Sequence, residues 1–287
     1  MKNLKRLPLI IVVGLLFVSS CKDGDNKPEL PTISLAQESL QSKAGESISV
    51  SVSYTTPEGF DRLEVEKKID GVVKETKTIN EDGSGSYNFE YDILVDDSDG
   101  ILSFTFTVHD KAEASASKDL VVEVELTSKQ LLNKYNWLLY QEIRKKTGDN
   151  EINDAYTDDI YRFNNDGSYD KSMGEKKDAF GDAWFNYCYW NIDDKDVLIM
   201  SRTGAFGEDV RDTLYITTLS SDELKADVIY YGLDVFNTGE EATPYEETEE
   251  FTKIFSAQPK GANFDPYGPG SDDDAGPAGS CNEVTFN

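Results

Sequence analysis

The chain has 287 residues, with 28 Lys and Arg residues against 55 Asp and Glu residues, and a formal net charge of −27. This acidity argues against nucleic-acid binding, because a phosphate backbone requires a basic face, and against electrostatic docking on an anionic lipid surface. Aromatic residues make up 11% of the chain, which argues against disorder. At roughly 150 residues per domain, the length predicts about two domains.

Residues 1–20 are predicted to be a lipoprotein signal peptide. Basic residues precede an uncharged run, Leu7–Val18, that is shorter than the roughly 20 residues of a membrane-spanning helix and typical of a secretory signal. The small residues Ser19 and Ser20 then precede Cys21, and this run resembles the bacterial lipobox. The resemblance implies cleavage before Cys21 and acylation of its sulfur. The alternative is an ordinary cleaved signal followed by a chance cysteine.

Residues 21–31 form a polar tether. The segment Lys22–Asn26 resembles the lysine-plus-acidic export tag of Bacteroidota-type surface lipoproteins, although Gly24 interrupts its acidic residues. The resemblance implies an outer-membrane protein that is lipid-anchored and exposed on the cell surface, with the periplasmic face as the alternative. An acidic body beside an acyl anchor is consistent with attachment through lipid alone.

Residues 32–126 alternate apolar and polar side chains at period two, which predicts half-buried strands. We expect about seven short strands without a helix, and a hairpin turn at Asp70-Gly71. This pattern predicts a β-sandwich and resembles the immunoglobulin-like modules of bacterial surface lipoproteins. The strands are expected near Ile33–Leu35, Ile48–Tyr54, Leu63–Ile69, Val72–Thr78, Tyr87–Ile93, Leu102–Val108 and Leu120–Val124.

An acidic turn in this region is a weak calcium candidate. Asp96, Asp97 and Asp99 cluster hard oxygen ligands before a glycine, as calcium sites require. They lack the distal Glu and the regular spacing of a helix-loop-helix calcium site, and an acidic turn between strands is the simpler interpretation. No metal site or cofactor is therefore predicted.

Residues 127–256 are predicted to form a second all-β domain. Thr127 or Ser128 caps a short amphipathic helix, and sequential strands joined mostly by short turns follow it. Such an order predicts an antiparallel up-and-down barrel of eight strands, which has room for packed side chains or one small ligand. The expected strands are Trp137–Ile143, Asp159–Phe163, Ser168–Met173, Ala183–Ile192, Val197–Ser201, Arg211–Thr217, Leu224–Tyr231 and Glu247–Phe255.

Several motifs in this order resemble the bacterial lipocalin-like domain: an opening helix, a Trp at the start of the first strand, a Phe-x-x-Asp-Gly-x-Tyr hairpin, a central Trp and a Leu-Ser-x-x-x-Leu turn. Here they are Trp137, Phe163, Asp166, Gly167, Tyr169, Trp190, Leu219, Ser220 and Leu224. The resemblance implies a barrel that holds a small apolar ligand. A packed barrel without a ligand is the alternative, and Leu233–Glu250 is a long acidic insertion before the last strand.

The most aromatic strand supplies the ligand-binding candidates, Trp184, Phe185, Tyr187, Tyr189 and Trp190. Because side chains alternate along a strand, either the Tyr and Phe residues or the two Trp residues face the barrel interior. The two cysteines that remain after lipidation, Cys188 and Cys281, are a candidate disulfide in an oxidising compartment. That bond would attach the Gly/Pro/Asp-rich tail, residues 257–287, to the outside of the barrel, and would leave the Trp residues facing outward.

No catalytic constellation is visible. The chain has 1 His, which excludes a zinc site with paired His ligands, and it lacks a nucleotide-binding glycine loop. We therefore expect a non-enzymatic, lipid-anchored envelope protein that binds a small apolar ligand or a partner through its barrel. One alternative is a glycan-binding accessory of a carbohydrate-uptake system, and another is a structural or adhesion subunit with envelope protein partners.

Overall fold

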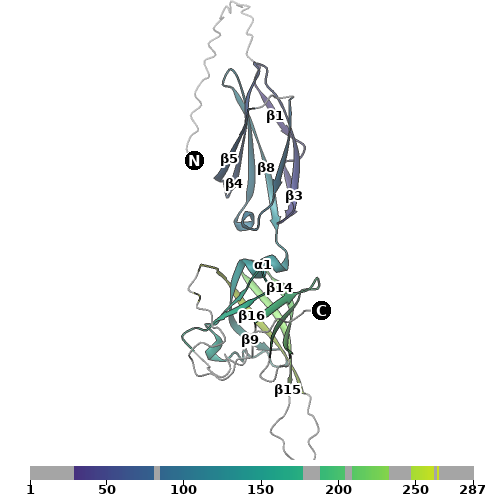
Figure 1. Cartoon of the computed structure of the whole chain (residues 1–287), viewed down its shortest axis with the longest axis vertical. Coiled ribbons are helices and arrows are strands. Elements are labelled where there is room, and N and C mark those ends of the chain that lie inside the picture. Colours follow the sequence, from purple (N-terminus) through teal and green to yellow (C-terminus); the bar gives the residue numbers. More distant parts are fainter. Residues whose placement is uncertain are drawn as a thin grey trace, which may run out of the picture.

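The computed structural model describes residues 29–80, 85–176, 188–203, 209–232, 247–261 and 264. It is 62% strand and 8% helix, which confirms the predicted all-β class. Within these ranges no helix is long and apolar enough to cross a membrane. The strands form two bodies, an N-terminal sandwich and a C-terminal barrel, with the short helix α1 between them (Figure 1).

The sandwich consists of a three-stranded sheet of order β1-β3-β6 and a five-stranded sheet of order β2-β8-β7-β4-β5. The strand β2 was not predicted; it pairs parallel with the edge of β8 and contributes one apolar side chain, Leu40, to the core margin. The elements are β1 (Thr32–Leu35), β2 (Ser39–Lys43), β3 (Ser47–Thr55), β4 (Phe60–Ile69), β5 (Val72–Ile79), β6 (Ser86–Asp92), the 3-10 helix η1 (Val95–Asp99), β7 (Leu102–Asp110) and β8 (Ser115–Glu125).

Apolar side chains fill the sandwich core between its two sheets. Period-two alternation turns one face of each strand inward, and Phe89, Phe104 and Phe106 meet there with ring centroids 4.8–5.1 Å apart for the two contacts of Phe89. The predicted hairpin between β4 and β5 is confirmed: Asp70 and Gly71 have φ values of 50° and 76°, as a type I′ turn requires.

The barrel is a single eight-stranded sheet of order β11-β10-β9-β16-β15-β14-β13-β12, in which all pairs are antiparallel. Sequential strands are neighbours, and the last strand returns to pair with the first, so the predicted up-and-down order is confirmed. The elements are α1 (Ser128–Lys134), β9 (Tyr135–Arg144), the 3-10 helix η2 (Asp154–Tyr156), β10 (Ile160–Phe163), β11 (Tyr169–Ser172), β12 (Tyr189–Ile192), β13 (Val197–Thr203), β14 (Asp209–Leu219), β15 (Glu223–Gly232) and β16 (Glu247–Pro259).

The barrel is nearly closed between β11 and β12. The Tyr169 amide donates to the Cys188 carbonyl at 2.8 Å, and the Trp190 amide donates to the Gly167 carbonyl at 2.9 Å. These bonds flank the isolated bridge between Ser168 and Tyr189. The hairpin turn at Gly167, which has a φ of +84°, therefore completes the wall of the barrel.

Helix α1 covers one end of the barrel. Thr127 is its N-cap and exchanges hydrogen bonds with Gln130 in a capping box. Leu132 is fully buried in the barrel core, and its carbonyl accepts a hydrogen bond from the Trp137 indole at 3.1 Å. Burial of the inward face of this single short helix therefore closes the barrel at the end that faces the sandwich.

The same helix joins the two bodies. The Gln130 side-chain amide donates to the Ala44 carbonyl of the sandwich at 2.9 Å. The Lys134 ammonium donates to the Ser98 hydroxyl at 2.6 Å and lies 2.7 Å from the Asp99 carboxylate. On the barrel side, Ser128 donates to Asp196 at 2.5 Å. The joint thus relies on polar contacts from one helix to both neighbours.

Candidate binding cavity in the barrel

The barrel interior encloses a cavity of about 530 Å³. Its apolar part lies at the end closed by α1, where Leu132 of the helix belongs to the same apolar cluster. Paired strands place apolar side chains opposite one another there: Leu198 on β13 pairs with Leu214 on β14, and Leu224 on β15 pairs with Phe255 on β16. The aliphatic, Met and Phe side chains of the lining are Leu139, Phe163, Leu198, Met200, Leu214, Leu224, Ile229 and Phe255.

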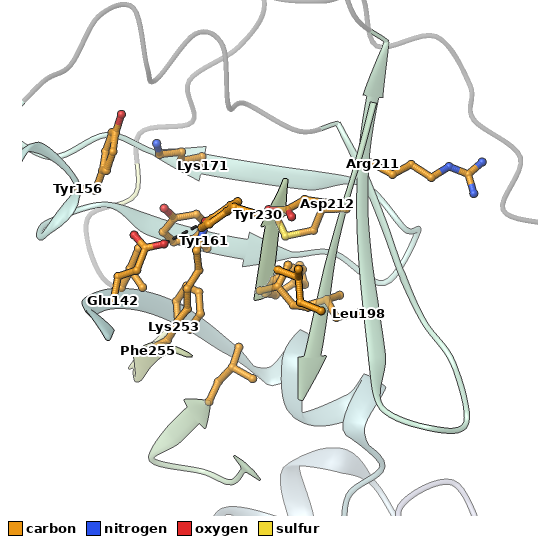
Figure 2. A pocket seen from close by; sticks show the side chains of 16 residues that line it. Glu142, Tyr156, Tyr161, Lys171, Leu198, Arg211, Asp212, Tyr230, Lys253 and Phe255 are labelled. Atoms are coloured by element: carbon orange, nitrogen blue, oxygen red, sulfur yellow. Dashed lines mark hydrogen bonds between the residues drawn. The ribbon is translucent and has the colours of Figure 1, made fainter. Parts of the chain in front are cut away.

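Four polar residues line the cavity on adjacent strands and are here called the polar belt: Glu142 on β9, Lys253 on β16, Tyr230 on β15 and Asp212 on β14. The Tyr230 hydroxyl donates to the Glu142 carboxylate at 3.0 Å (Figure 2). The Lys253 ammonium lies 5.4 Å from the centroid of the Tyr230 ring. The belt therefore alternates anionic, cationic, neutral and anionic groups around one side of the wall.

A β-bulge in β9 turns Glu142 inward. Leu139 pairs with Phe255, but Gln141 pairs with Ile254, so Tyr140 is an extra residue in the strand. Tyr140 is 38% exposed on the outer face. Because one inserted residue reverses the facing of all later side chains, Glu142 pairs with Lys253 on the cavity side.

The Lys253 ammonium remains charged although protein surrounds it. Burial alone disfavours its charged form, but the interaction with the Tyr230 hydroxyl and the negative field of the Asp212 and Glu142 carboxylates more than offset that penalty, so the pKa of Lys253 lies well above its usual range. Its side chain keeps partial exposure, which is toward the cavity that it lines. Burial raises the pKa of the Tyr230 hydroxyl, which stays neutral at physiological pH.

A second charged group in the cavity wall is internally paired. The Lys171 ammonium on β11 lies 2.7 Å from the Asp159 carboxylate, and both side chains are buried. The ammonium also lies 5.1 Å and 5.7 Å from the ring centroids of Tyr156 and Tyr161. Lys171 is therefore neutralised by the protein itself. Figure 2 shows Arg211, which also borders the cavity, directed away from the other labelled side chains.

Only part of the predicted ligand-binding strand can be compared with the structure. Trp190 is 2% exposed, packs on Phe163 at 5.2 Å between ring centroids, and donates its indole hydrogen to the Asn164 carbonyl at 3.0 Å. It pairs with Met200, which lines the cavity, so Trp190 faces inward and the outward alternative is wrong for this residue. Tyr189 has the opposite facing and is half-buried; Trp184, Phe185 and Tyr187 lie outside the described residues.

The predicted covalent sites lie mostly outside the described residues. Cys21 and Cys281 lie outside the described residues, and Cys188 is 7% exposed beside β12. In the tail beyond β16 and the turn that follows it, Phe264 is the one described residue. The centroid of its ring lies 3.6 Å from Cζ of the Arg162 guanidinium on β10. The Cys188–Cys281 bond remains a prediction, which mass spectrometry of a non-reducing digest would decide.

The acidic turn in the sandwich is not arranged as a cation site. Asp97 is 2% exposed, and its carboxylate pairs with the Lys67 ammonium at 2.5 Å and accepts from the Tyr91 hydroxyl at 2.8 Å. Asp99 pairs instead with Lys134, and Asp96 is exposed. Across the described residues, no group of three His, Cys, Asp or Glu side chains could hold a metal ion.

The polar belt was not predicted from the sequence, although one of its members leaves a visible signal. In the last strand, Phe251, Lys253 and Phe255 share one face at period two, so a lysine between two core phenylalanines indicates an interior charge. Glu142 leaves no such signal because its inward facing depends on the bulge.

No known protein-family model matches the chain, and no curated protein matches it. The all-β fold with its nearly closed eight-stranded barrel is compatible with a lipocalin-like barrel.

Proposed function

We propose that the barrel binds a small amphipathic molecule, with the apolar part of the ligand at the α1 end and its polar part at the polar belt. The supporting observation is the cavity of about 530 Å³, which falls within the range of roughly 300–1,000 Å³ that is typical of small-molecule sites. Eight aliphatic, Met and Phe side chains supply the contact area, and the polar belt orients the ligand. This proposal refines the purely apolar ligand expected from sequence.

The proposed setting is the outer membrane of a Bacteroidota-type cell, with Cys21 acylated and the body exposed at the surface. This part depends on the signal-like N-terminus and on the export-tag resemblance. The mass of the N-terminal peptide from the native protein tests it directly. We expect acyl groups on Cys21 and, for Cys21→Ser, release of the protein into the aqueous phase of a detergent partition. A peptide that begins elsewhere and carries no lipid would contradict the anchor.

Ligand binding is tested by blocking the cavity from within. Leu214 lines the cavity, whereas its neighbour Tyr215 is 46% exposed on the outer face of the same strand. We expect Leu214→Trp to weaken binding of the fluorescent amphiphile 1-anilinonaphthalene-8-sulfonate by about tenfold or more, because the added ring occupies the cavity. Tyr215→Trp is the matched control and should leave the affinity unchanged.

Two results would contradict the ligand-binding proposal: equal affinity in both variants, or no saturable binding to the wild type. Native mass spectrometry of the protein purified from its own host then identifies what the cavity carries. For the glycan-binding alternative, Trp190 is buried and cannot serve as a stacking platform, whereas Trp184 lies outside the described residues. Binding to an envelope protein partner would appear as stoichiometric recovery of that partner from membranes without a small ligand.

A further inference from the structure

The charges of the polar belt bear on the chemical class of the ligand, an inference that rests on the proposed function. Lys253 and Asp212 both line the cavity, from strands separated by β15. Within the described part of the chain, neither has an oppositely charged group at ion-pair distance, whereas the nearby Lys171 has Asp159 at 2.7 Å. The belt thus presents an ammonium and a carboxylate that the protein leaves separate.

The field of Asp212 and Glu142 keeps Lys253 charged, but neither carboxylate lies at ion-pair distance from it. Enclosed charges gain most from a partner in direct contact. Glu142 accepts a hydrogen bond from the Tyr230 hydroxyl at 3.0 Å, whereas no described residue donates a hydrogen bond to the Asp212 carboxylate. In the described part of the belt, Asp212 is therefore the carboxylate without a donor, and Lys253 is the ammonium without an ion pair. An anionic ligand would satisfy Lys253 but face the Asp212 and Glu142 carboxylates, and a cationic ligand would satisfy Asp212 but face Lys253.

We propose that the cavity selects amphiphiles with a zwitterionic head, whose anionic group pairs with Lys253 and whose cationic group pairs with Asp212, while the chain lies among the leucines near α1. Such a head satisfies both charges and leaves the net charge of the site unchanged. The rings of Tyr161 and Tyr230, which line the same cavity, offer further faces to a cationic group.

The test compares three probes with the same twelve-carbon chain: dodecanoate, dodecylamine and the zwitterion N-dodecyl-N,N-dimethylglycine. Each is titrated into the full mature protein below its micelle concentration and followed by calorimetry. We expect the zwitterion to bind about tenfold more tightly than either singly charged probe. Equal or tighter binding of dodecanoate or dodecylamine would overturn the inference.

Two isosteric variants should shift the preference in opposite directions. Lys253→Met should favour dodecylamine over dodecanoate by about tenfold, and Asp212→Asn should favour dodecanoate by a similar factor. Ratios between probes are measured within one variant, so a partly unfolded sample affects both values equally. Lys225→Met and Asp227→Asn, which make the same charge changes on the outer face of β15, are the controls and should preserve the wild-type order.

The outcomes separate the two proposals. Wild-type binding of all three probes with equal affinity would leave the amphipathic cavity intact and refute zwitterion selection. Unchanged ratios in Lys253→Met and Asp212→Asn would refute it as well. If none of these probes binds, and 1-anilinonaphthalene-8-sulfonate binding is insensitive to Leu214→Trp, both proposals fail together.

Discussion

The two bodies of this protein are built from the same kind of strand, yet one is solid and the other is hollow. In the sandwich, β7 turns only apolar side chains inward until its last residue, and aromatic rings from β6 and β7 fill the space between the sheets. In the barrel, β16 places Lys253 between Phe251 and Phe255 on the inner face. Inward-facing charges that border an open cavity are therefore present in the barrel, whereas the described core of the sandwich is filled by apolar side chains.

The largest expected effect is a difference between equivalent leucines. Leu102 in the sandwich and Leu224 in the barrel are both 0% exposed, but Leu224 borders the cavity. We expect Leu102→Ala to cost about 4–5 kcal/mol of unfolding free energy and Leu224→Ala about 2–3 kcal/mol, because a side chain beside a void makes fewer contacts. Hydrogen exchange within each body measures the two values separately. Equal costs would mean that the barrel is as tightly packed as the sandwich.

The next effect concerns the charge that the sandwich buries at its margin. The Asp97 carboxylate pairs with the Lys67 ammonium and accepts a hydrogen bond from the Leu94 amide at 2.9 Å. Asp97→Ala removes this acceptor from both groups. We expect a loss of about 3 kcal/mol in denaturant unfolding of the sandwich. The exposed neighbour Asp96 provides the control, and Asp96→Ala should stay within about 0.5 kcal/mol of the wild type. A melting temperature that rises with added calcium would restore the cation-site interpretation.

A smaller effect is expected at the joint. Lys134→Ala removes the contacts to Ser98 and Asp99 that connect α1 to the sandwich. We expect a destabilisation of about 1 kcal/mol and a larger radius of gyration in X-ray solution scattering, because the two bodies move more independently. Lys146→Ala, an exposed lysine on the barrel, should change neither quantity. An unchanged scattering profile for Lys134→Ala would show that the other contacts suffice.

The smallest effect is a pH dependence in the turn between β12 and β13. The amides of Val197 and Lys195 donate to the Asp193 carboxylate at 2.9 Å and 2.8 Å and hold its pKa below the usual range. A depressed pKa stabilises the fold above the unfolded value of about 3.9, and that contribution is lost as the pH falls through the folded value. Asp193→Asn should therefore lower the melting temperature at pH 7 but not at about pH 2. A constant difference across that range would contradict this.

Strand order and the turns between strands were predictable because period-two alternation and Gly-containing turns are local signals. The hairpins at Asp70-Gly71 and Asp166-Gly167 follow from these signals. The return of the last strand to the first follows from the closure that an up-and-down order of eight strands requires. The strand β2 was missed since only Leu40 among its residues is apolar, and its place depends on parallel pairing with β8, which is distant in sequence.

The candidate site was predicted less well than the fold. Aromatic density directed attention to Trp190 and its neighbours, but Trp190 is part of the apolar wall. The polar belt combines side chains from four strands, and only the completed barrel brings Glu142 and Asp212 into one cavity with Lys253. No local sequence pattern predicts that these side chains meet in one cavity. The lysine between two phenylalanines on β16 indicates only that one charged side chain faces the interior.

The extra residue in β9 changes which alternate residues of the strand face the barrel interior. Before Tyr140 the strand presents apolar side chains, such as Leu139, to the interior; after it, the opposite set of positions does so, and Glu142 enters the belt. If the same residues were paired without the bulge, Gln141 would lie opposite Lys253 and Ile143 opposite Phe251 on the inner face, and Glu142 would lie on the outside. The bulge therefore decides whether this part of the cavity wall carries a carboxylate, without altering the number or order of strands.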